Sequence, residues 1–387
     1  MTILNIPTPS YLSDGEFAAF GDSASRFLDT HAGAEQVKLW RQAGLVPRSF
    51  WKAAGEAGLL GLSIAEKYGG HGGDFRHEVV LMEQIGSRGI EGWDATLHNT
   101  IIAPYLETYG SEAQKLEWLP QLASGDVVAA IAITEPGTGS DLKAVRTTAH
   151  RDGDEYVING SKTFISNGQN ADLILVVAKT DSSLGAKGIS LLLVDARKAP
   201  GFARGRNLDK VGRDLADTSE LFFNDVRVPV TNLLGLEEGR GFAQLMESLP
   251  QERLVVAVQS SVAMRYALQL TVEYVKQRKA FGGALIDFQT IQFKLAELKT
   301  EATIAGVFVN HCVGLHLEGR LDTATASMAK YWVTDLHCKL VDECLQLHGG
   351  YGYMSEYPIA QAYKDARVNR IYGGTNEIMK LLIARTL

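Results

Sequence analysis

The sequence predicts an α+β protein in which an antiparallel β domain separates two helical domains. Hydrophobic residues recur at helical spacing up to about residue 126 and again after Gly241. Between these regions, short β-branched and aromatic runs alternate with turn dipeptides. We therefore expect an N-terminal α-helical domain (1–126), a middle antiparallel β-barrel domain (127–237) and a C-terminal four-helix bundle (238–387).

Two helices of the N-terminal region can be placed from the sequence. In the segment from Pro47 to Gly70, Trp51, Ala54, Leu59 and Leu60 follow mostly helical spacing, and Gly69-Gly70 ends the pattern. A second, shorter helix is expected to begin after Ser111. Ser111 would cap its first turn, and Gln114 stands where it can close a capping box.

The middle region carries the turn signals of antiparallel strands. Asn159-Gly160 separates the runs YVI and KTFI and predicts a hairpin, because both turn residues tolerate positive φ. Asp152-Gly153 predicts a second tight turn just upstream. The region is therefore expected to be a small antiparallel barrel or sandwich.

The C-terminal region predicts long helices. One is expected from about 242 to 279, and two more carry apolar stripes at helical spacing, the first of them with steps of three or four residues. The stripes are Ile291, Leu295, Leu298, Ala302, Ala305 and Val309 in one helix, and Ala329, Val333, Leu336, Leu340 and Leu347 in the other. Long helices joined by short turns favour a four-helix bundle.

Composition excludes several classes of protein. The net charge of −7 argues against a nucleic-acid partner, since phosphate binding requires a basic surface. No apolar run reaches the roughly 20 residues of a membrane span, and the first residues do not resemble a signal peptide, so a soluble cytoplasmic protein, bacterial or already processed, is expected. Cys312, Cys338 and Cys344 lack metal-ligand spacing and are predicted to be reduced packing residues, with no metal site.

Glycine-rich segments are the first sign of chemistry. They are AIAITEPGTGSD (130–141), FISNG (164–168), QLHGGYGY (346–353) and IYGGTNEI (371–378). Glycine lets the backbone approach a ligand closely and exposes N–H groups, so such loops could hold a phosphate or the polar edge of a flavin ring. Each segment alone is also compatible with a structural turn. None reads GxGxxG between a strand and a helix, which argues against a nicotinamide site of the Rossmann type.

Five blocks in order, TEPGTGSD, FISNG, QRKAFG, QLHGGYGY and YGGTNEI, resemble the signature blocks of the acyl-CoA dehydrogenase family over nearly the whole chain. Within that family the sequence is most similar to the long-chain branch, through LPQERLVVA, YVKQRKAFG and YGGTNEIMKLLIAR. The resemblance implies the three-domain fold, FAD as cofactor and a homotetramer. It also implies dehydrogenation of an acyl-CoA thioester, long-chain or branched, to the trans-2-enoyl-CoA.

The resemblance further implies which residues bind FAD, each carried over by its position in a motif. On the flavin side they are Ile133, Thr134, Gly139, Ser140, Phe164, which would cover one flavin face, and Ser166, near the flavin N5. On the adenosine diphosphate side, supplied by a neighbouring chain, they are Arg278, Phe281, Gln289, Gln346, Gly349 and Gly350, and Thr375 and Glu377 would complete the site. Substrate contacts are expected at Ser140, Arg253, Tyr372 and Gly374.

The catalytic base departs from the commonest pattern of the family. Many members carry a Glu after the Tyr of the IYEGT block, where this chain has Gly373. The isovaleryl and long-chain branches place the base on a helix in an ERLV context, which here makes Glu252 the candidate. The alternative is a solvated Glu that interacts with the dipole in the first turn of a helix. In the family, a backbone N–H at the Gly373 position helps to bind the thioester oxygen as negative charge develops.

Other functions on the same fold stay open at this point. An acyl-CoA oxidase or flavin monooxygenase would pass electrons to oxygen, although oxidases tend to be longer and monooxygenases generally lack the base. A non-catalytic FAD-containing binding protein is a second alternative. The acyl group could also be tethered to a carrier protein instead of CoA. Electron-transfer flavoprotein is the electron acceptor that the resemblance implies.

Overall fold

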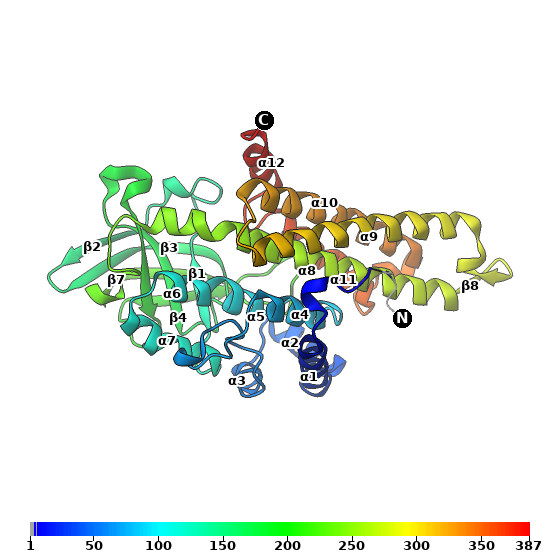
Figure 1. The fold of residues 1–387 in the computed structure, drawn as a ribbon, viewed down its shortest axis with the longest axis horizontal. Coiled ribbons are helices and arrows are strands. Elements are labelled where there is room, and N and C mark those ends of the chain that lie inside the picture. Colours follow the sequence, from blue (N-terminus) through cyan, green and yellow to red (C-terminus); the bar gives the residue numbers. More distant parts are fainter. Residues whose placement is uncertain (1–3, 5) are drawn as a thin grey trace.

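The computed structural model describes Leu4 and residues 6–387, and its elements follow the expected order of helices, strands and helices (Figure 1). The N-terminal helices are α1 (Gly15–His31), α2 (Ala34–Ala43), α3 (Arg48–Glu56), α4 (Phe75–Gly86), α5 (Ala95–Leu97), α6 (Ala103–Tyr109) and α7 (Glu112–Ala123). A π-helical segment, His98–Ile102, joins α5 to α6.

The predicted capping box is present at α7. The Ser111 hydroxyl accepts from the Gln114 backbone N–H, and the Gln114 side chain accepts from Ser111 N–H. The helix expected through Leu59 and Leu60 is shorter than predicted. It ends at Glu56 because Gly58 adopts φ +71°, and the two leucines are buried beyond the helix end.

The strands are β1 (Ala129–Ala132), β2 (Thr148–Asp152), β3 (Glu155–Ser166), β4 (Leu173–Lys179), β5 (Ile189–Asp195), β6 (Phe202–Asn207) and β7 (Thr218–Pro229). They form one curled sheet that is mostly antiparallel, as the sequence predicts. Two of its pairings, β1 with β4 and β2 with β4, are parallel. In the sequence, the β2–β3 hairpin separates β1 from β4. In the sheet, β4 lies beside β1 and runs in the same direction.

The hairpin predicted at Asn159-Gly160 is wrong. β3 runs straight through both residues, and its register with β7 shifts between Ile158 and Gly160. Asn159 exchanges two hydrogen bonds of 2.9 Å with Asp225 of β7, and a Cβ on Gly160 would overlap Thr147. The dipeptide therefore marks a bulge and a close approach. The tight turn predicted at Asp152-Gly153 is confirmed, since it joins β2 to β3 with Gly153 at φ +63°.

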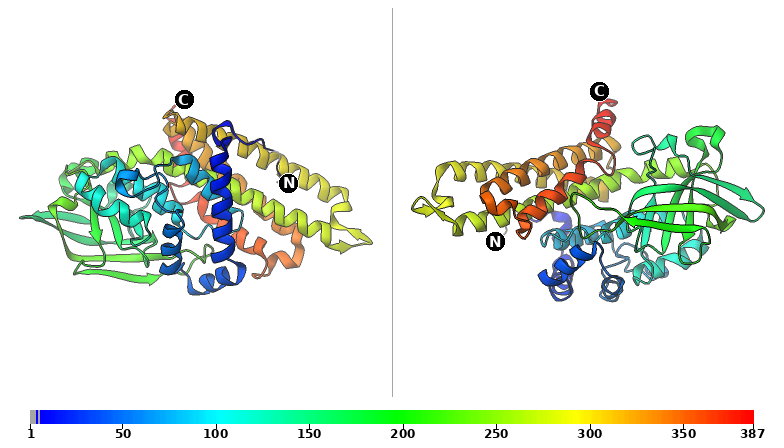
Figure 2. Two further views of the ribbon diagram at one scale, coloured as in Figure 1. Left: turned by 60° about the horizontal axis from the view of Figure 1, so that its bottom comes forward. Right: turned by 180° about the vertical axis from the view of Figure 1, so that it is seen from behind.

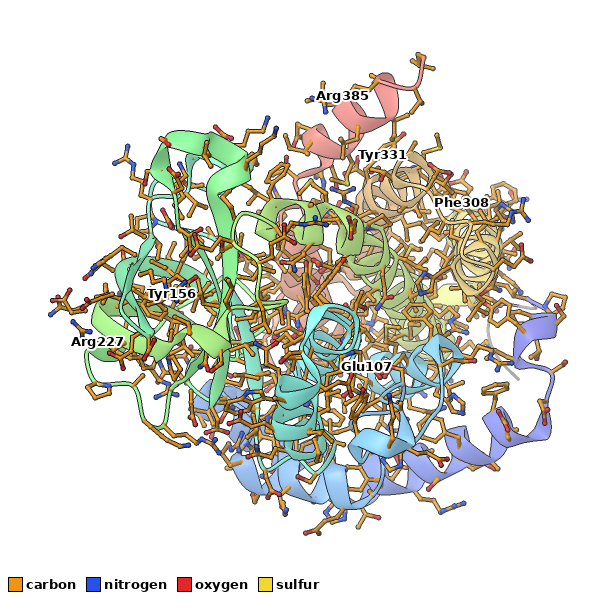
Figure 3. The ribbon with its side chains drawn as sticks, turned by 60° about the vertical axis from the view of Figure 1, so that its left-hand side comes forward. Glu107, Tyr156, Arg227, Phe308, Tyr331 and Arg385 are labelled. Carbon is orange, nitrogen blue, oxygen red and sulfur yellow. The ribbon has the colours of Figure 1, made fainter. Side chains whose placement is uncertain are left out.

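Both faces of β4 are buried. Leu173, Leu175 and Val177 pack against the N-terminal helices, whereas Ile174, Val176 and Ala178 pack inside the curled sheet. This alternation is the period of two that a strand imposes. Tyr156 of β3 and Arg227 of β7, labelled in Figure 3, lie on this domain far from the helical bundle. Over the part of the chain that the structure describes, no helix combines the length and apolarity that crossing a bilayer requires.

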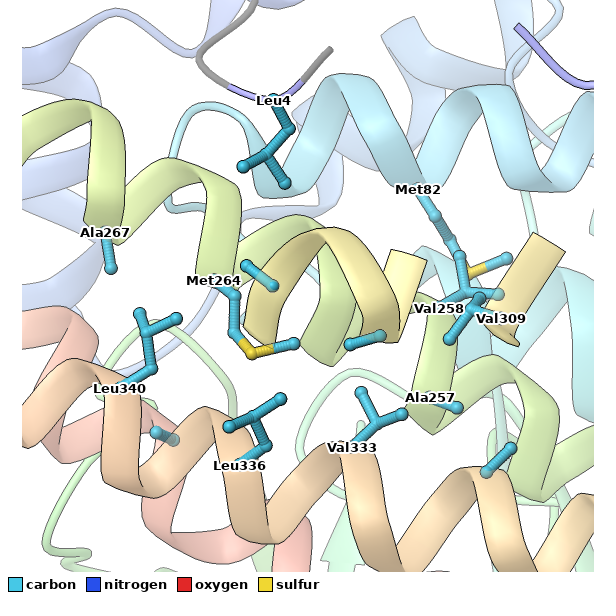
Figure 4. Close-up of a cluster of buried hydrophobic side chains, with 14 of the residues drawn as sticks. Leu4, Met82, Ala257, Val258, Met264, Ala267, Val309, Val333, Leu336 and Leu340 are labelled. Carbon is cyan, nitrogen blue, oxygen red and sulfur yellow. The ribbon is translucent and has the colours of Figure 1, made fainter. Parts of the chain in front are cut away.

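The C-terminal elements are α8 (Gly241–Gln277), β8 (Lys279–Ala280), β9 (Gly283–Ala284), α9 (Gln289–Leu317), α10 (Thr323–His348), α11 (Pro358–Ala366) and α12 (Asn376–Ala384). α8, α9 and α10 are the three predicted long helices, and most residues of the predicted stripes meet in one core with Met82 of α4 (Figure 4). Ile291, Leu295 and Leu347 lie outside this core, and Ile291 and Leu347 line a pocket at the end of the bundle. The molecule is elongated, with the curled sheet at one end and the β8–β9 hairpin at the other (Figures 1 and 2).

Candidate active site

Glu252 lies in the interior of α8 and is only 8% exposed. The Tyr105 phenol of α6 donates a hydrogen bond of 3.0 Å to Glu252 Oε1. Burial raises the pKa of the Glu252 carboxyl to about 7, and the bond from Tyr105 and the charge of Arg253 oppose that rise. The alternative of a solvated carboxylate in a first helical turn is therefore wrong. A carboxyl with a pKa near 7 is suited to proton transfer at neutral pH.

The turn at Gly373 and Gly374 faces the same side of α8. Both residues have positive φ, +64° and +91°. A Cβ on Gly373 would lie 3.7 Å from Val256 Cγ2, which is ordinary van der Waals contact. Val256 follows Glu252 by one helical turn and so shares its face of α8. A carboxylate from position 252 and one from position 373 would therefore approach the same region.

Two buried cations lie behind this turn. Lys330 of α10 is 0% exposed, and its ammonium donates to Gly374 O (2.7 Å) and Asn376 Oδ1 (2.9 Å). Burial and the charge of Arg253 lower the Lys330 pKa to about 8. The Arg253 guanidinium is itself buried, with a long contact of 3.5 Å from Nη1 to Ser327 Oγ and no hydrogen-bond partner for Nε among the described residues. This positive charge favours an anion at the turn.

Tyr372, a predicted substrate residue, is engaged within the protein. Its phenol donates to Asn369 Oδ1 (2.7 Å), and Arg213 Cζ lies 5.8 Å from its ring centroid. Thr375 caps α12 by accepting from Ile378 N–H, and Glu377 is exposed in the first turn of that helix. Hydrogen bonds from its own backbone N–H and from Thr375 lower the Glu377 pKa. Hydrogen bonds within the protein thus hold Tyr372 and the first turn of α12 in place.

The loop after β1 is anchored to the sheet by a buried carboxylate. Glu135 accepts from Lys162 Nζ (2.9 Å) and from the backbone N–H groups of Arg146 (2.7 Å) and Thr147 (2.9 Å). The predicted residues Gly139 and Ser140 are exposed, and a Cβ on Gly139 would meet no described atom within 4 Å. Beside them, Ile133 and Thr134 are half-buried. The loop thus offers backbone groups next to open space.

The FISNG segment is joined to this loop. Thr163 N–H donates to Thr134 O (2.9 Å), which places Phe164 directly beside the loop. Phe164 is 67% exposed and has φ +60°, a conformation that non-glycine residues rarely adopt. Ser166 ends β3, opposite Thr218. An exposed aromatic ring held in a strained conformation next to a glycine loop fits a planar ligand such as a flavin ring.

Four of the six residues predicted to bind the adenosine diphosphate come together where α8 and α10 end. Arg278, Gln346, Gly349 and Gly350 line a pocket of about 620 Å³ beside Tyr351. Phe281 and Gln289 do not line it. Phe281 is 97% exposed at the tip of the β8–β9 hairpin, with φ +51°, and Gln289 begins α9. Within one chain, this pocket lies where α8 and α10 end, on the side of the bundle toward the β8–β9 hairpin, whereas Phe164 belongs to β3 of the curled sheet (Figure 1).

Sequence reasoning missed several residues of the site. Tyr105 contacts Glu252 across 147 positions of sequence, and Lys330 contacts the turn across 44. For the Tyr105–Glu252 contact, the only signal in the sequence was the spacing of Tyr105 and Tyr109, which places two phenols on one face of a helix. Lys330 gave no signal, because a buried lysine cannot be told from an exposed one by its neighbours in sequence. Among residues 4 and 6–387, no group of three metal-ligating side chains comes together.

Comparison with known proteins places this geometry in a family. Three family models match: "Acyl-CoA dehydrogenase, N-terminal domain" over residues 14–126, the middle domain over 130–226 and the C-terminal domain over 239–387. The chain is 48% identical to the mitochondrial long-chain specific acyl-CoA dehydrogenase of Sus scrofa over 374 residues, covering 96% of this chain and 86% of that protein.

Solved structures agree. An acyl-CoA dehydrogenase from Geobacillus kaustophilus superposes with a TM-score of 0.94 at 48% identity, covering 98% of this chain and 99% of that one. A glutaryl-CoA dehydrogenase from Mycobacterium smegmatis in complex with FADH2 gives a TM-score of 0.89 at 28% identity, covering 97% and 95%. These matches favour a dehydrogenase over the oxidase, monooxygenase and binding-protein alternatives. This chain belongs to the acyl-CoA dehydrogenase family, FAD-dependent oxidoreductases that act on acyl-CoA, and within it to the long-chain branch.

Proposed function

We propose that this protein dehydrogenates long-chain acyl-CoA in fatty-acid β-oxidation, with Glu252 as the base that removes the α-proton. One observation carries the assignment of the base. The Glu252 carboxyl is buried, has a pKa of about 7, and lies on the same face of α8 as Val256, the residue next to Gly373. Position 373 has no carboxylate of its own. Glu252 therefore takes the place of the missing side chain.

The protein's own groups divide the work of proton removal. Glu252 accepts the α-proton in its carboxylate form, which the hydrogen bond from Tyr105 favours. The backbone N–H of Gly373 donates to the thioester oxygen as negative charge develops there. Lys330 fixes the turn through Gly374 O, and Arg253 adds positive charge behind it. When bound, FAD supplies the acceptor for the β-hydrogen, which leaves as hydride.

We propose that FAD is held by two copies of the chain. Ile133, Thr134, Gly139, Ser140, Phe164 and Ser166 would hold the flavin half, with Thr375 and Glu377 nearby. Arg278, Phe281, Gln289, Gln346, Gly349 and Gly350 of a neighbouring copy would hold the adenosine diphosphate, in a homotetramer. The separation of the two groups within one chain supports this, as does the exposed hairpin at Phe281. If it holds, Arg278→Ala lowers FAD content while light scattering still finds the wild-type assembly; unchanged FAD content would contradict it.

The preference for long acyl chains rests on two supports. The first is the 48% identity to a long-chain specific enzyme. The second is Gly373, which leaves open volume next to Val256 where other members carry a Glu side chain. Ser140, Arg253, Tyr372 and Gly374 are the proposed substrate contacts.

Electron-transfer flavoprotein is the proposed electron acceptor, and the cytoplasm is the proposed location, although the pig relative is mitochondrial. The domain boundaries at 126/127 and 237/238 are proposed as well.

Anaerobic titration of the purified holoenzyme with a panel of acyl-CoAs tests the proposed substrate. We expect long straight-chain acyl-CoA to bleach the flavin band at the lowest concentration. Bleaching only by short or branched acyl-CoA would contradict the chain-length assignment. No bleaching by any acyl-CoA, but bleaching by an acylated carrier protein, would move the substrate to the carrier-bound class.

A further inference from the structure

A row of hydroxyl groups leads from the buried base to the protein surface. Tyr105 and Tyr109 stand one turn apart on α6, with ring centroids 6.0 Å from each other. The Tyr105 phenol contacts Glu252 Oε1 at 3.0 Å, and the Tyr109 phenol donates to Oε2 of the exposed Glu247 at 2.9 Å. Glu247 and Glu252 lie on α8, little more than one helical turn apart. The two phenol–carboxylate contacts therefore run side by side between α6 and α8.

Ser248 stands between the two contacts, because it is next to Glu247 in α8 and precedes Glu252 by one helical turn. Hydrogen bonding with the Ser248 side chain lowers the pKa of Tyr105 and of Tyr109, against the larger effect of burial. The order of groups is thus Glu252, Tyr105, Ser248, Tyr109 and Glu247. Each of the three hydroxyls can donate one proton and accept another, which is what proton transfer along a chain requires. Figure 3 labels Glu107 on the same short helix α6.

We propose that this row is the path by which the abstracted proton leaves Glu252, an inference that rests on Glu252 being the base. After each turnover the carboxyl is protonated and must lose that proton before it can act again. Glu252 is 8% exposed, so direct exchange with bulk water is hindered. Glu247 at the other end is in contact with solvent.

The transfer balances without any charged hydroxyl intermediate. The carboxylic acid of Glu252 gives its proton to Tyr105 Oη as Tyr105 gives its own to Ser248 Oγ. Ser248 passes its proton to Tyr109 Oη, and Tyr109 passes its proton to the Glu247 carboxylate. Glu252 is left as carboxylate with Tyr105 donating to it, which is the arrangement that the structure shows. Glu247 then releases the proton to water. Because burial keeps the pKa of both phenols above their usual value, concerted transfer is favoured over a free phenolate.

The experiment separates proton exchange from flavin reduction. An acyl-CoA with sulfur in place of the β-carbon has α-protons but no β-hydrogen, so it can be deprotonated and reprotonated but not dehydrogenated. Oxidised holoenzyme is incubated with the 3-thia analogue of palmitoyl-CoA in D2O, and mass spectrometry follows deuterium at the α-carbon. Anaerobic stopped-flow with palmitoyl-CoA gives the rate of flavin reduction, which needs only the first proton transfer.

Cutting the row far from the base is the decisive change. In Tyr109→Phe and in Ser248→Ala, we expect α-exchange to fall by at least about tenfold relative to flavin reduction. An unchanged ratio in both variants would overturn the relay, and so would a parallel loss of both rates. Tyr68→Phe is the matched control, because it removes a similar phenol–carboxylate bond to Glu112 (2.8 Å) away from α8. It is expected to keep both wild-type rates.

Glu252→Gln distinguishes failure of the relay from failure of the proposed function. If Glu252→Gln exchanges α-protons at the wild-type rate, Glu252 is not the base and the relay has no origin. If Glu252→Gln abolishes exchange while Tyr109→Phe and Ser248→Ala keep the wild-type ratio, the base is correct and only the path is wrong.

Discussion

The Tyr105 phenol on α6 donates a hydrogen bond of 3.0 Å to Oε1 of Glu252 on α8. This contact joins α6 of the N-terminal domain to α8 of the bundle at Glu252, the proposed base. Burial raises the Glu252 pKa to about 7, and the phenol opposes that rise by stabilising the carboxylate. The position and the charge state of this carboxyl therefore both depend on one tyrosine, which is also the first group of the proposed path for proton release.

The rate of flavin reduction should depend on the ionisation of Glu252. The base acts as carboxylate, so the rate rises with pH through about 7 and levels off above it. In Tyr105→Phe the carboxylate loses its donor, the pKa rises further, and the midpoint moves to higher pH. Below the midpoint we expect a rate loss of roughly tenfold, since a hydrogen bond to a charged group contributes about 1.5–3 kcal/mol. Stopped-flow reduction across pH measures this; an unmoved midpoint would refute it.

A carboxylate at position 373 should substitute in part for Glu252. Gly373 has room for a Cβ beside Val256, although its φ of +64° costs a side chain about 1–2 kcal/mol. Gly373→Glu in the Glu252→Gln background is expected to regain a measurable part of the reduction rate. Gly373→Gln in the same background is the matched control, because it carries the same strain and bulk without a base. Equal rates in the two double variants would contradict the shared location.

Phe164 should matter for FAD and little for the fold. Its side chain is 67% exposed, so Phe164→Ala is expected to change the unfolding free energy of the FAD-free protein by no more than about 0.5 kcal/mol. The amount of FAD retained after gel filtration should fall, because the Phe164 ring would no longer cover one face of the flavin. Leu184→Ala, at another exposed apolar residue of the β domain, serves as control and should retain FAD. Full FAD retention by Phe164→Ala would remove Phe164 from the cofactor site.

Lys330 should stabilise both the fold and the turn. Lys330→Met removes the donor to Gly374 O and leaves Asn376 Oδ1 with only the longer bond from Thr334 Oγ1 (3.3 Å) among the described residues, and a buried unsatisfied acceptor costs about 1–3 kcal/mol. Denaturant unfolding should show a loss in that range, together with slower flavin reduction. Lys339→Met, on the exposed side of the same helix and paired with Glu301 at the surface, should change stability by no more than about 0.5 kcal/mol. Equal stability of the two variants would be inconsistent with the buried contacts.

Local signals in the sequence predicted local structure well. The Ser111–Gln114 capping box, the extent of α8 and the existence of α9 and α10 follow from neighbouring residues, because caps and apolar periodicity act over a few positions. The hairpin at Asn159-Gly160 failed for a tertiary reason. Asp225 on β7 satisfies Asn159, and Thr147 takes the space beside Gly160, so the strand continues through a bulge.

Motifs in the sequence named the candidate site residues, and the folded structure shows which groups those residues contact. Glu252 could be named from its ERLV context, but its burial and its bond to Tyr105 depend on how α6 packs against α8. Lys330 behind the Gly373 turn depends likewise on the packing of α10 against the start of α12. Contacts across such sequence distances leave no periodic trace, so only the folded structure reveals them.

Anaerobic flavin reduction in Glu252→Gln by a long-chain acyl-CoA tests directly whether Glu252 is the base. The variant must first be shown to be folded and loaded with FAD. Removing a base that transfers a proton in the transition state predicts a fall of roughly 10²–10⁴-fold in the rate of bleaching. Reduction at the wild-type rate by folded, FAD-loaded Glu252→Gln would mean that Glu252 is not the base.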